Sequence, residues 1–181
     1  MADLPVVAQV VSGTFGDLFL RQKHENELEI GDLLVTEVPR GYQLLQVQDL
    51  AFGSQMRERM LQFVAGMKLE EAPTDLGFMD EALSTYVLAS VRSVLTVAEG
   101  IPRLPKTLPG FMGAVRHASK EDFRFLLKPE RPLFLGQIRS GSKILDVPVY
   151  LDGEQAMTHH ILVPATTGRG KSNMVKVLLY S

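Results

Sequence analysis

The segment ATTGRGKS, residues 165–172, constrains the fold more than any other feature of the sequence. It follows an apolar run, residues 161–164, and it precedes an apolar stretch that begins at Met174. A strand, a glycine-rich loop and a helix in this order form a phosphate-binding loop, in which backbone N–H groups at a helix N-terminus surround a phosphate chain. The segment therefore predicts a nucleotide-binding site.

The residue types in this loop suit that chemistry. Gly168 and Gly170 can adopt positive φ angles without a Cβ penalty. Lys171 would bring an ammonium group to the β and γ phosphates of ATP, and the hydroxyl of Ser172 would ligate the accompanying Mg²⁺. Lys171 is also the catalytic residue that we expect. The expected nucleotide-binding residues are Thr166, Thr167, Gly168, Arg169, Gly170, Lys171, Ser172 and Asn173.

One position departs from the full pattern G-x-x-x-x-G-K-S, because Ala165 replaces its first glycine. Alanine is small, so we interpret this difference as a variation of the same loop. The alternative interpretation is a flexible glycine-rich turn that caps a helix. The apolar patterns of the flanking strand and helix favour the nucleotide loop.

The composition excludes several classes of protein. With 45% hydrophobic residues, the 181-residue chain can bury one ordinary core and a small second unit. The absence of cysteine excludes a disulfide framework and a thiolate zinc site. A formal net charge of -2 gives no general attraction to nucleic acid or to anionic membranes. The first residues show no signal-peptide or membrane-span pattern, so we expect a cytoplasmic protein without a membrane partner.

The first part of the chain has the pattern of a small antiparallel β-barrel. Residues 6–53 alternate short apolar runs with glycine-containing turns. Residues 85–97 are rich in β-branched side chains and return to the same sheet. Between them, residues 54–69 have apolar side chains at helical spacing, which favours a core-facing helix over a partner surface. That stripe consists of Met56, Met60, Phe63, Val64 and Met67.

The remaining segments connect the barrel to the loop. The acidic stretch 70–81 is predicted to be a solvated loop and not a metal site. Three prolines, Pro102, Pro105 and Pro109, indicate an irregular basic connection that is exposed or docked. Ser119 is predicted to start a helix with Phe123, Leu126 and Leu127 on its apolar side, and two strands are expected around the turn 139–141. His24, His117, His159 and His160 are interpreted as structural or solvated residues, with a phosphate contact of His117 as the alternative.

The predicted fold is mostly β: a small N-terminal β-barrel with accessory helices, followed by the truncated start of an α/β P-loop domain. Residues 171–181 are expected to be a helix, whose apolar stripe must pack on the barrel, on another copy or on residues beyond Ser181. A P-loop domain needs further parallel strands, so we expect a fragment that is inactive alone. The expected domains are the barrel, 1–53 and 85–97, the helical and acidic insertion, 54–84, the connection, 98–155, and the P-loop start, 156–181.

The strand pair LGQIR…ILDVPVYLD and the segment THHILVPATTGRGKSN resemble the HerA family of hexameric DNA-translocating ATPases. The residue match covers 133–179, where His160 corresponds to the family's histidine before the strand and TTGRGKSN to its loop. Residues 6–53 and 85–97 match the family's N-terminal barrel in pattern only. Ala165 and the bulky Arg169 depart from the commonest family form.

The resemblance implies a RecA-like ATPase that forms a hexameric ring, moves along double-stranded DNA and works with a NurA-type nuclease in DNA end processing. It implies that the barrel meets the nuclease and that DNA is contacted mainly by the rest of the ATPase domain. Two alternatives stay open: a P-loop ATPase of conjugation or type IV secretion, and a pure protein-interaction barrel.

Overall fold

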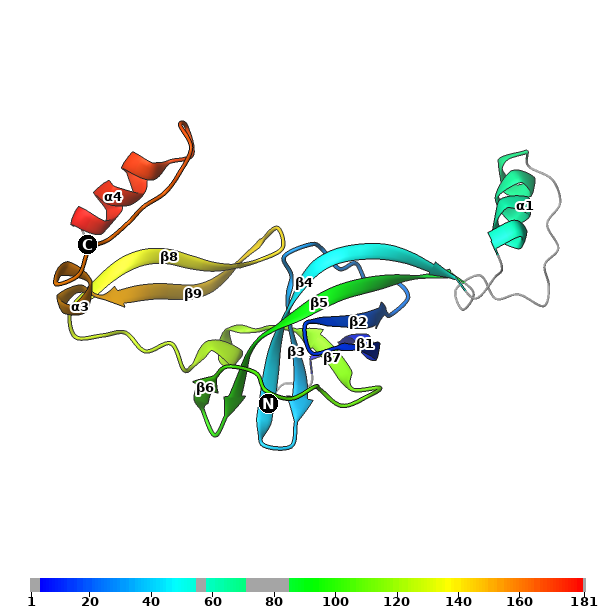
Figure 1. Cartoon of the computed structure of the whole chain (residues 1–181), viewed down its shortest axis with the longest axis horizontal. Helices are drawn as coiled ribbons and strands as arrows, with labels where there is room; N and C mark the ends of the chain where they lie inside the picture. The colour runs from blue at the N-terminus through cyan, green and yellow to red at the C-terminus, as the bar shows by residue number, and fades with distance from the viewer. Residues whose placement is uncertain (1–3, 55–57, 71–84, 181) are drawn as a thin grey trace. The chain divides into compact units, whose positions relative to one another are not determined.

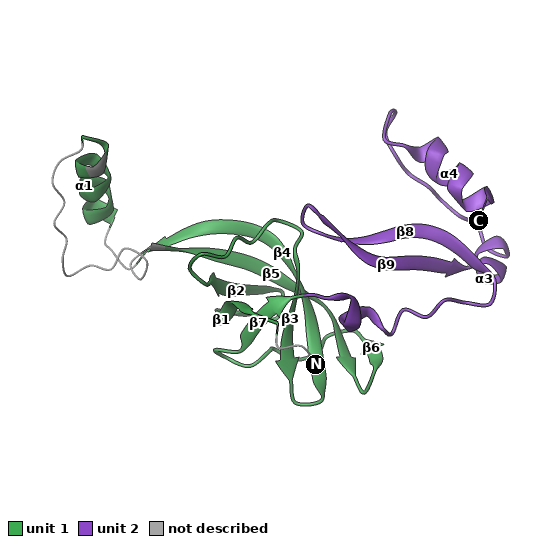
Figure 2. Cartoon of the chain, turned by 180° about the vertical axis from the view of Figure 1, so that it is seen from behind, with its two compact units in different colours: residues 1–117 green, residues 118–181 purple. Residues whose placement is uncertain are grey.

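The computed structural model describes residues 4–54, 58–70 and 85–180 (Figure 1). The chain divides into two compact units, residues 1–117 and residues 118–181 (Figure 2). The first unit contains a β-barrel and one helix, and the second contains a β-hairpin with short helices. Each unit is described by itself below.

Six strands of the first unit form a closed barrel. Their order is β2-β1-β7-β3-β4-β5, and β2 pairs again with β5. A short strand, β6, Ile101–Arg103, extends the sheet beyond β5. The predicted barrel is thus confirmed. The six strands are β1 (Val6–Thr14), β2 (Asp17–Gln22), β3 (Leu33–Val38), β4 (Gly41–Ser54), β5 (Thr85–Ala98) and β7 (Ala114–His117).

The core of the barrel comes mainly from one face of the strands, although four successive residues of β3, 33–36, are all buried. Leu20, Leu34, Leu45 and Val91 are fully buried and belong to different strands. Alternate residues of β2 point to opposite faces of the sheet, so Leu18 and Leu20 are buried while Arg21 reaches the outer surface. The alternation explains why the sequence pattern located these strands.

The predicted irregular connection contains two strands, so that expectation is wrong for part of its length. Pro102 lies in β6, which pairs only with β5 among the described strands, and an edge strand tolerates a residue without an N–H donor. Strand β7 follows the last proline and pairs with β1 and β3. Its Val115 is fully buried. The barrel therefore includes 114–117, which the sequence analysis assigned to the connection.

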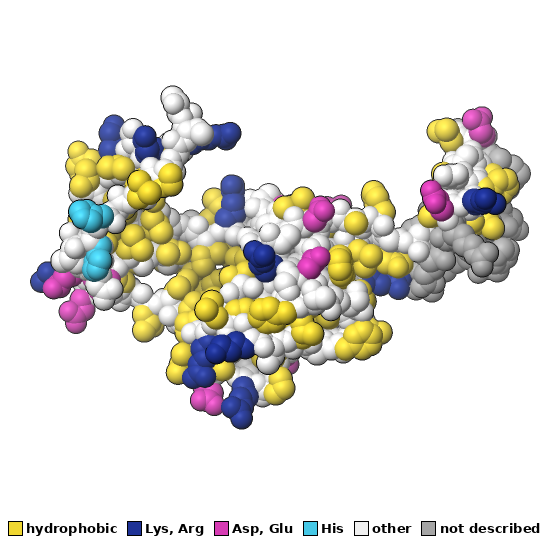
Figure 3. Space-filling model, viewed as in Figure 1, with side chains coloured by type: hydrophobic (Ala, Val, Ile, Leu, Met, Phe, Trp, Pro, Cys, Tyr) yellow, Lys and Arg dark blue, Asp and Glu magenta, His cyan; other side chains and the backbone are white. Residues whose placement is uncertain are grey.

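Side-chain hydrogen bonds attach the proline-rich segment between β6 and β7 to the barrel. The buried Gln43 donates from Nε2 to the carbonyl oxygen of Thr107 at 2.9 Å. Gln9 donates from Nε2 to the carbonyl oxygen of Met112 at 2.8 Å. In Figure 3, hydrophobic and basic side chains lie next to each other in the region where Figure 1 labels β6. The segment is docked through its backbone and leaves Leu104 exposed.

Helix α1, Glu58–Leu69, confirms the helix predicted after the fourth strand. Its apolar stripe differs from the expectation. Val64 is buried, but Phe63 and Met60 are exposed to 62% and 47%, so the assignment of these two residues to the core is wrong. Met56 and the acidic residues 71–81 lie outside the described residues.

The second unit begins with a single 3₁₀ turn, η1, Lys120–Phe123. The Asp122 carboxylate accepts hydrogen bonds from the N–H of Ser119 at 2.7 Å and from its hydroxyl at 3.0 Å. Lys120 forms an ion pair with Asp146 at 2.6 Å. Hydrogen bonds from its own backbone and from Ser119 lower the pKa of the Glu121 carboxyl below its usual range. The local interactions of the cap therefore form as the sequence predicted.

The helix expected after Ser119 is shorter than predicted. Phe123 is buried, whereas Leu126 and Leu127 are exposed to 39% and 82%. A helix is stabilised mainly by packing of its apolar face, and the second apolar turn has no such packing here. The chain therefore leaves the helical conformation after one turn.

A β-hairpin forms the centre of the second unit. Strands β8, Pro132–Ser140, and β9, Lys143–Asp152, are antiparallel, and their turn lies at residues 141–142. The strand pair is confirmed, with the turn displaced toward the C-terminus. Helices α3, Gly153–Met157, and α4, Lys171–Tyr180, follow. Among the helices of the described residues, none has the length and hydropathy to cross a membrane.

The start of β4 provides a test of the barrel. Gly41 has a φ of 148°, and a Cβ atom there would lie 2.0 Å from the carbonyl oxygen of Val97. Gly41→Ala is therefore expected to lower the free energy of unfolding by about 2 kcal/mol or more, measured by urea denaturation. Gly16→Ala is the control, because a Cβ there has no neighbour within 4 Å. Equal stability of the two variants would contradict this account of the β4 start.

Candidate functional site

The phosphate-loop segment follows α3 and not a strand. Asp152 caps α3, since its carboxylate accepts from the N–H groups of Glu154 at 3.0 Å and Gln155 at 3.2 Å. Residues 160–166 have no assigned secondary structure, so the strand predicted at 161–164 is not formed. A strand is stabilised by pairing with a neighbour, and no other described strand pairs with this segment. Leu162 is accordingly 87% exposed.

The loop itself has the predicted backbone. Gly168 and Gly170 have φ angles of 82° and 81°, in the left-handed region that glycine adopts at little cost. The N–H of Arg169 donates to the carbonyl oxygen of Thr166 at 3.3 Å, which closes a turn around the first glycine. The N–H of Met174 donates to the carbonyl oxygen of Gly170 at 2.9 Å and begins the helical hydrogen bonds.

The helix that follows places the polar residues of the motif in its first turn. Lys171, Ser172 and Asn173 are the first three residues of α4, and all of residues 164–177 are exposed. The first N–H groups of a helix have no partner within the helix, and together with the helix dipole they favour an anion. All eight predicted nucleotide-binding residues thus lie in one continuous loop and helix start.

The donor set at this position fits Mg²⁺ that arrives with a nucleotide. The Ser172 hydroxyl is a hard oxygen ligand, and Mg²⁺ is commonly held by few protein ligands together with phosphate oxygens and waters. The described residues contain no cluster of three His, Cys, Asp or Glu side chains that could hold a metal alone. His159 is exposed, with Nδ1 2.7 Å from the carbonyl oxygen of Gln155, in agreement with its structural interpretation.

Helix α4 packs against β8 of the same unit. Leu178 is buried, whereas Met174 and Val175 are each 39% exposed and Leu179 is 70% exposed. The predicted helix is confirmed. The expected cover for its apolar stripe was the barrel, another copy or later residues, whereas in the described structure α4 contacts β8 of the preceding hairpin.

Sequence reasoning missed two features that position the loop. Helix α3 separates the hairpin from the loop, and no helix was predicted there. The Asp152 cap in the sequence DGEQ was the available signal, since an aspartate before a short polar helix is a common N-cap. The contact of α4 with β8 joins distant segments and leaves no local signal.

The comparison with family models agrees with the loop assignment. Residues 133–181 match the model described as the central domain of the helicase HerA. The match begins in β8 and includes the hairpin, α3, the loop and α4, and it supports a P-loop ATPase of the HerA type, with the nucleotide and Mg²⁺ binding general to that class. Residues 1–132, which contain the barrel, lie outside the match. A search of curated proteins found no match.

The left-handed glycines provide a test of the site. Gly170→Ala is expected to weaken ATP binding about tenfold, because an L-residue in this region costs roughly 1–2 kcal/mol. A Cβ at Gly170 meets nothing within 4 Å, so the effect would come from the backbone and not from a clash. Calorimetric titration with ATP and Mg²⁺ measures it. Ala165→Gly is the control and should bind at least as tightly as the wild type. Unchanged affinity in Gly170→Ala would contradict the role of this glycine.

Proposed function

We propose that the chain forms part of an ATP-dependent DNA translocase of the HerA type, with residues 156–181 at the start of its RecA-like ATPase domain. One observation carries this proposal: the segment with two left-handed glycines before a lysine-serine helix start lies within the match to the HerA central domain.

The residues of the loop divide the binding of ATP between them. The backbone N–H groups of residues 168–172 would surround the β phosphate, and the Lys171 ammonium would balance the charge of the β and γ phosphates. Ser172 would orient Mg²⁺, which when bound neutralises charge that develops on the phosphates. We infer that the residues that position the attacking water come from elsewhere in the ATPase domain or from a neighbouring subunit.

The exposed segment before the loop supports a larger domain. Ile161 and Leu162 are exposed to 51% and 87%, and P-loop sheets are parallel, with strands that are buried on both faces. We infer that residues 161–164 become a strand when further strands of the ATPase domain pair with them. The exposed Leu179 and Tyr180 of α4 would be covered in the same way.

The proposal extends to assembly and partners. A hexameric ring of such domains would translocate on double-stranded DNA, and the barrels would form a face of the ring that docks a NurA-type nuclease for DNA end processing. A closed barrel supports docking through loops and side chains, since it has few free strand edges for pairing with a partner.

A lysine substitution tests the ATPase proposal. In the assembled protein, Lys171→Ala is expected to lower ATP turnover at least about a hundredfold, because the charge on the transferring phosphate loses its partner. Lys176→Ala is the matched control, since Lys176 is also exposed on α4 but lies outside the loop. Phosphate release with and without linear double-stranded DNA measures turnover, and gel filtration checks assembly. Ordinary turnover in Lys171→Ala would refute the proposal.

A second candidate function, a protein-interaction module, is favoured by the closed core of the first unit. If the barrel alone docks the nuclease, residues 1–155 should retain a NurA-type nuclease in a pull-down as well as the assembled protein does. Residues 118–181 provide the control and should retain none. Binding that requires the ATPase domain would contradict an interaction module that acts by itself.

A further inference from the structure

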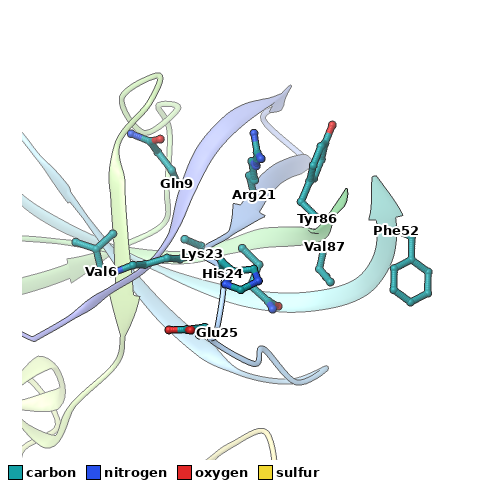
Figure 4. Close-up of a pocket in the computed structure, with 11 residues that line it drawn as sticks. Val6, Gln9, Arg21, Lys23, His24, Glu25, Phe52, Tyr86 and Val87 are labelled. Carbon is teal, nitrogen blue, oxygen red and sulfur yellow. The ribbon is translucent and has the colours of Figure 1, made fainter. Parts of the chain in front are cut away.

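The long antiparallel pair of β4 and β5, the β4–β5 ribbon, carries an apolar face beyond the core of the barrel. Leu50 packs on the core cluster, and Phe52 follows two residues later on the same face. Val87 lies opposite Phe52 in the register and shares that face (Figure 4). Tyr86 points to the other side, where the guanidinium carbon of Arg21 lies 4.2 Å from its ring centroid. Phe52 is 97% exposed, so the apolar face extends into solvent.

Phe52 and Val87 line a hollow of about 290 Å³ beside the loop between β2 and β3. Leu28 of that loop is buried in its wall, whereas Glu27 and Glu29 are exposed. Residues 23–32 contain four acidic residues and one lysine. The hollow is therefore apolar at its centre and acidic along one side.

A second surface of the same unit has the opposite charge. Residues 101–108, the strap, begin in β6 and contain Arg103 and Lys106 but no acidic residue. Both basic side chains are exposed, and Leu104 between them is 80% exposed. Pro102 and Pro105 restrict the backbone of the strap before any partner binds, which lowers the entropy cost of binding. The strap thus presents an apolar side chain between two positive charges, which complements the hollow.

The strap is held too far from the hollow of its own chain to fill it. Arg103 lies opposite Thr96 in the β5–β6 register. Gln43 lies opposite Thr96 on β4, and its side chain donates to the carbonyl oxygen of Thr107. Val87 precedes Thr96 by nine residues on β5, which is roughly 30 Å of strand. The strap is therefore fixed toward one end of β5 and the hollow lies at the other end.

We propose that the hollow binds the strap of a second copy of this chain. Leu104 would enter the hollow and cover Phe52, and Lys106 would lie beside Glu27. Because the two surfaces differ, the contact is head-to-tail: each copy donates its strap to one neighbour and receives a strap from another. Such a contact closes into a ring when the rotation between copies allows it. The inference rests on the proposed function, because it specifies how the barrels of the proposed ring contact each other.

Sedimentation velocity of the 181-residue chain, without nucleotide, tests this contact over a series of protein concentrations. The wild type should associate as the concentration rises. Phe52→Asp and Leu104→Asp should each raise the dissociation constant at least about tenfold, because each places a charge in the apolar centre of the contact. Phe15→Asp is the control and should associate as the wild type does. Phe15 is 50% exposed in the turn between β1 and β2, outside both surfaces.

Mixing the two defective variants distinguishes a head-to-tail contact from a symmetric one. Phe52→Asp retains an intact strap, and Leu104→Asp retains an intact hollow. An equimolar mixture should therefore form dimers with a dissociation constant close to that of the wild type, but no larger species. Recovery of dimers in the mixture also shows that both variants are folded.

A charge exchange tests the polar part of the contact. Lys106→Glu and Glu27→Lys should each weaken association, because like charges then face each other. The chain with both substitutions should recover most of the wild-type association, because every contact again joins opposite charges. Added salt should weaken association of the wild type.

Lys171→Ala separates this contact from the proposed ATPase site. The variant should associate as the wild type does, whatever its ATP turnover, so the failure of one proposal can be told from the failure of the other. Unchanged association in Phe52→Asp and Leu104→Asp, or a mixture of the two without dimers, would overturn the proposal. A wild type that stays monomeric over the whole concentration series would also overturn it and would indicate that the hollow receives a segment of another protein.

Discussion

The pairing of β2 with β5 is the constraint on which the first unit depends. It joins Leu18, Phe19, Leu20 and Arg21 to residues 88–91 and thereby closes the barrel. Closure gives both edge strands a partner, and it buries Leu20, Ala89 and Val91 completely. Without this pairing the sheet would have two open edges, each with unpaired N–H and C=O groups. The outer face of the same pairing also brings Arg21 to Tyr86.

The barrel strands with clear alternation could be predicted from the sequence, because their buried side chains recur at every second residue. Strand β7 could not, since its four residues are too few for a pattern and three prolines precede it. Its place between β1 and β3 depends on pairing with strands far away in the chain. The exposure of Phe63 on α1 likewise reflects what the helix contacts, and helical spacing alone carries no information on that.

The nucleotide loop differs from β7 and α1, because it could be predicted from consecutive residues alone. Its geometry is local, so the positions of Gly168 and Gly170 and the start of α4 at Lys171 follow from a few consecutive residues. The strand expected at 161–164 is not formed, because a strand is stabilised by pairing with a second segment, and no described strand pairs with this one. The hairpin was predicted as a pair of strands, but the contact of its strand β8 with α4 was not predicted. A sequence motif thus predicts which residues form a binding loop better than it predicts which segments pack around that loop.

The β4–β5 ribbon has a consequence for how this protein can vary. The register runs from Gly41 opposite Ala98 to Ser54 opposite Thr85, so the two ends of the intervening segment are already held together by the ladder. The entropy of closing that segment grows only by about 0.6 kcal/mol for each doubling of its length. Homologues could therefore lengthen, shorten or exchange the residues between Ser54 and Thr85 while the same barrel folds beneath them.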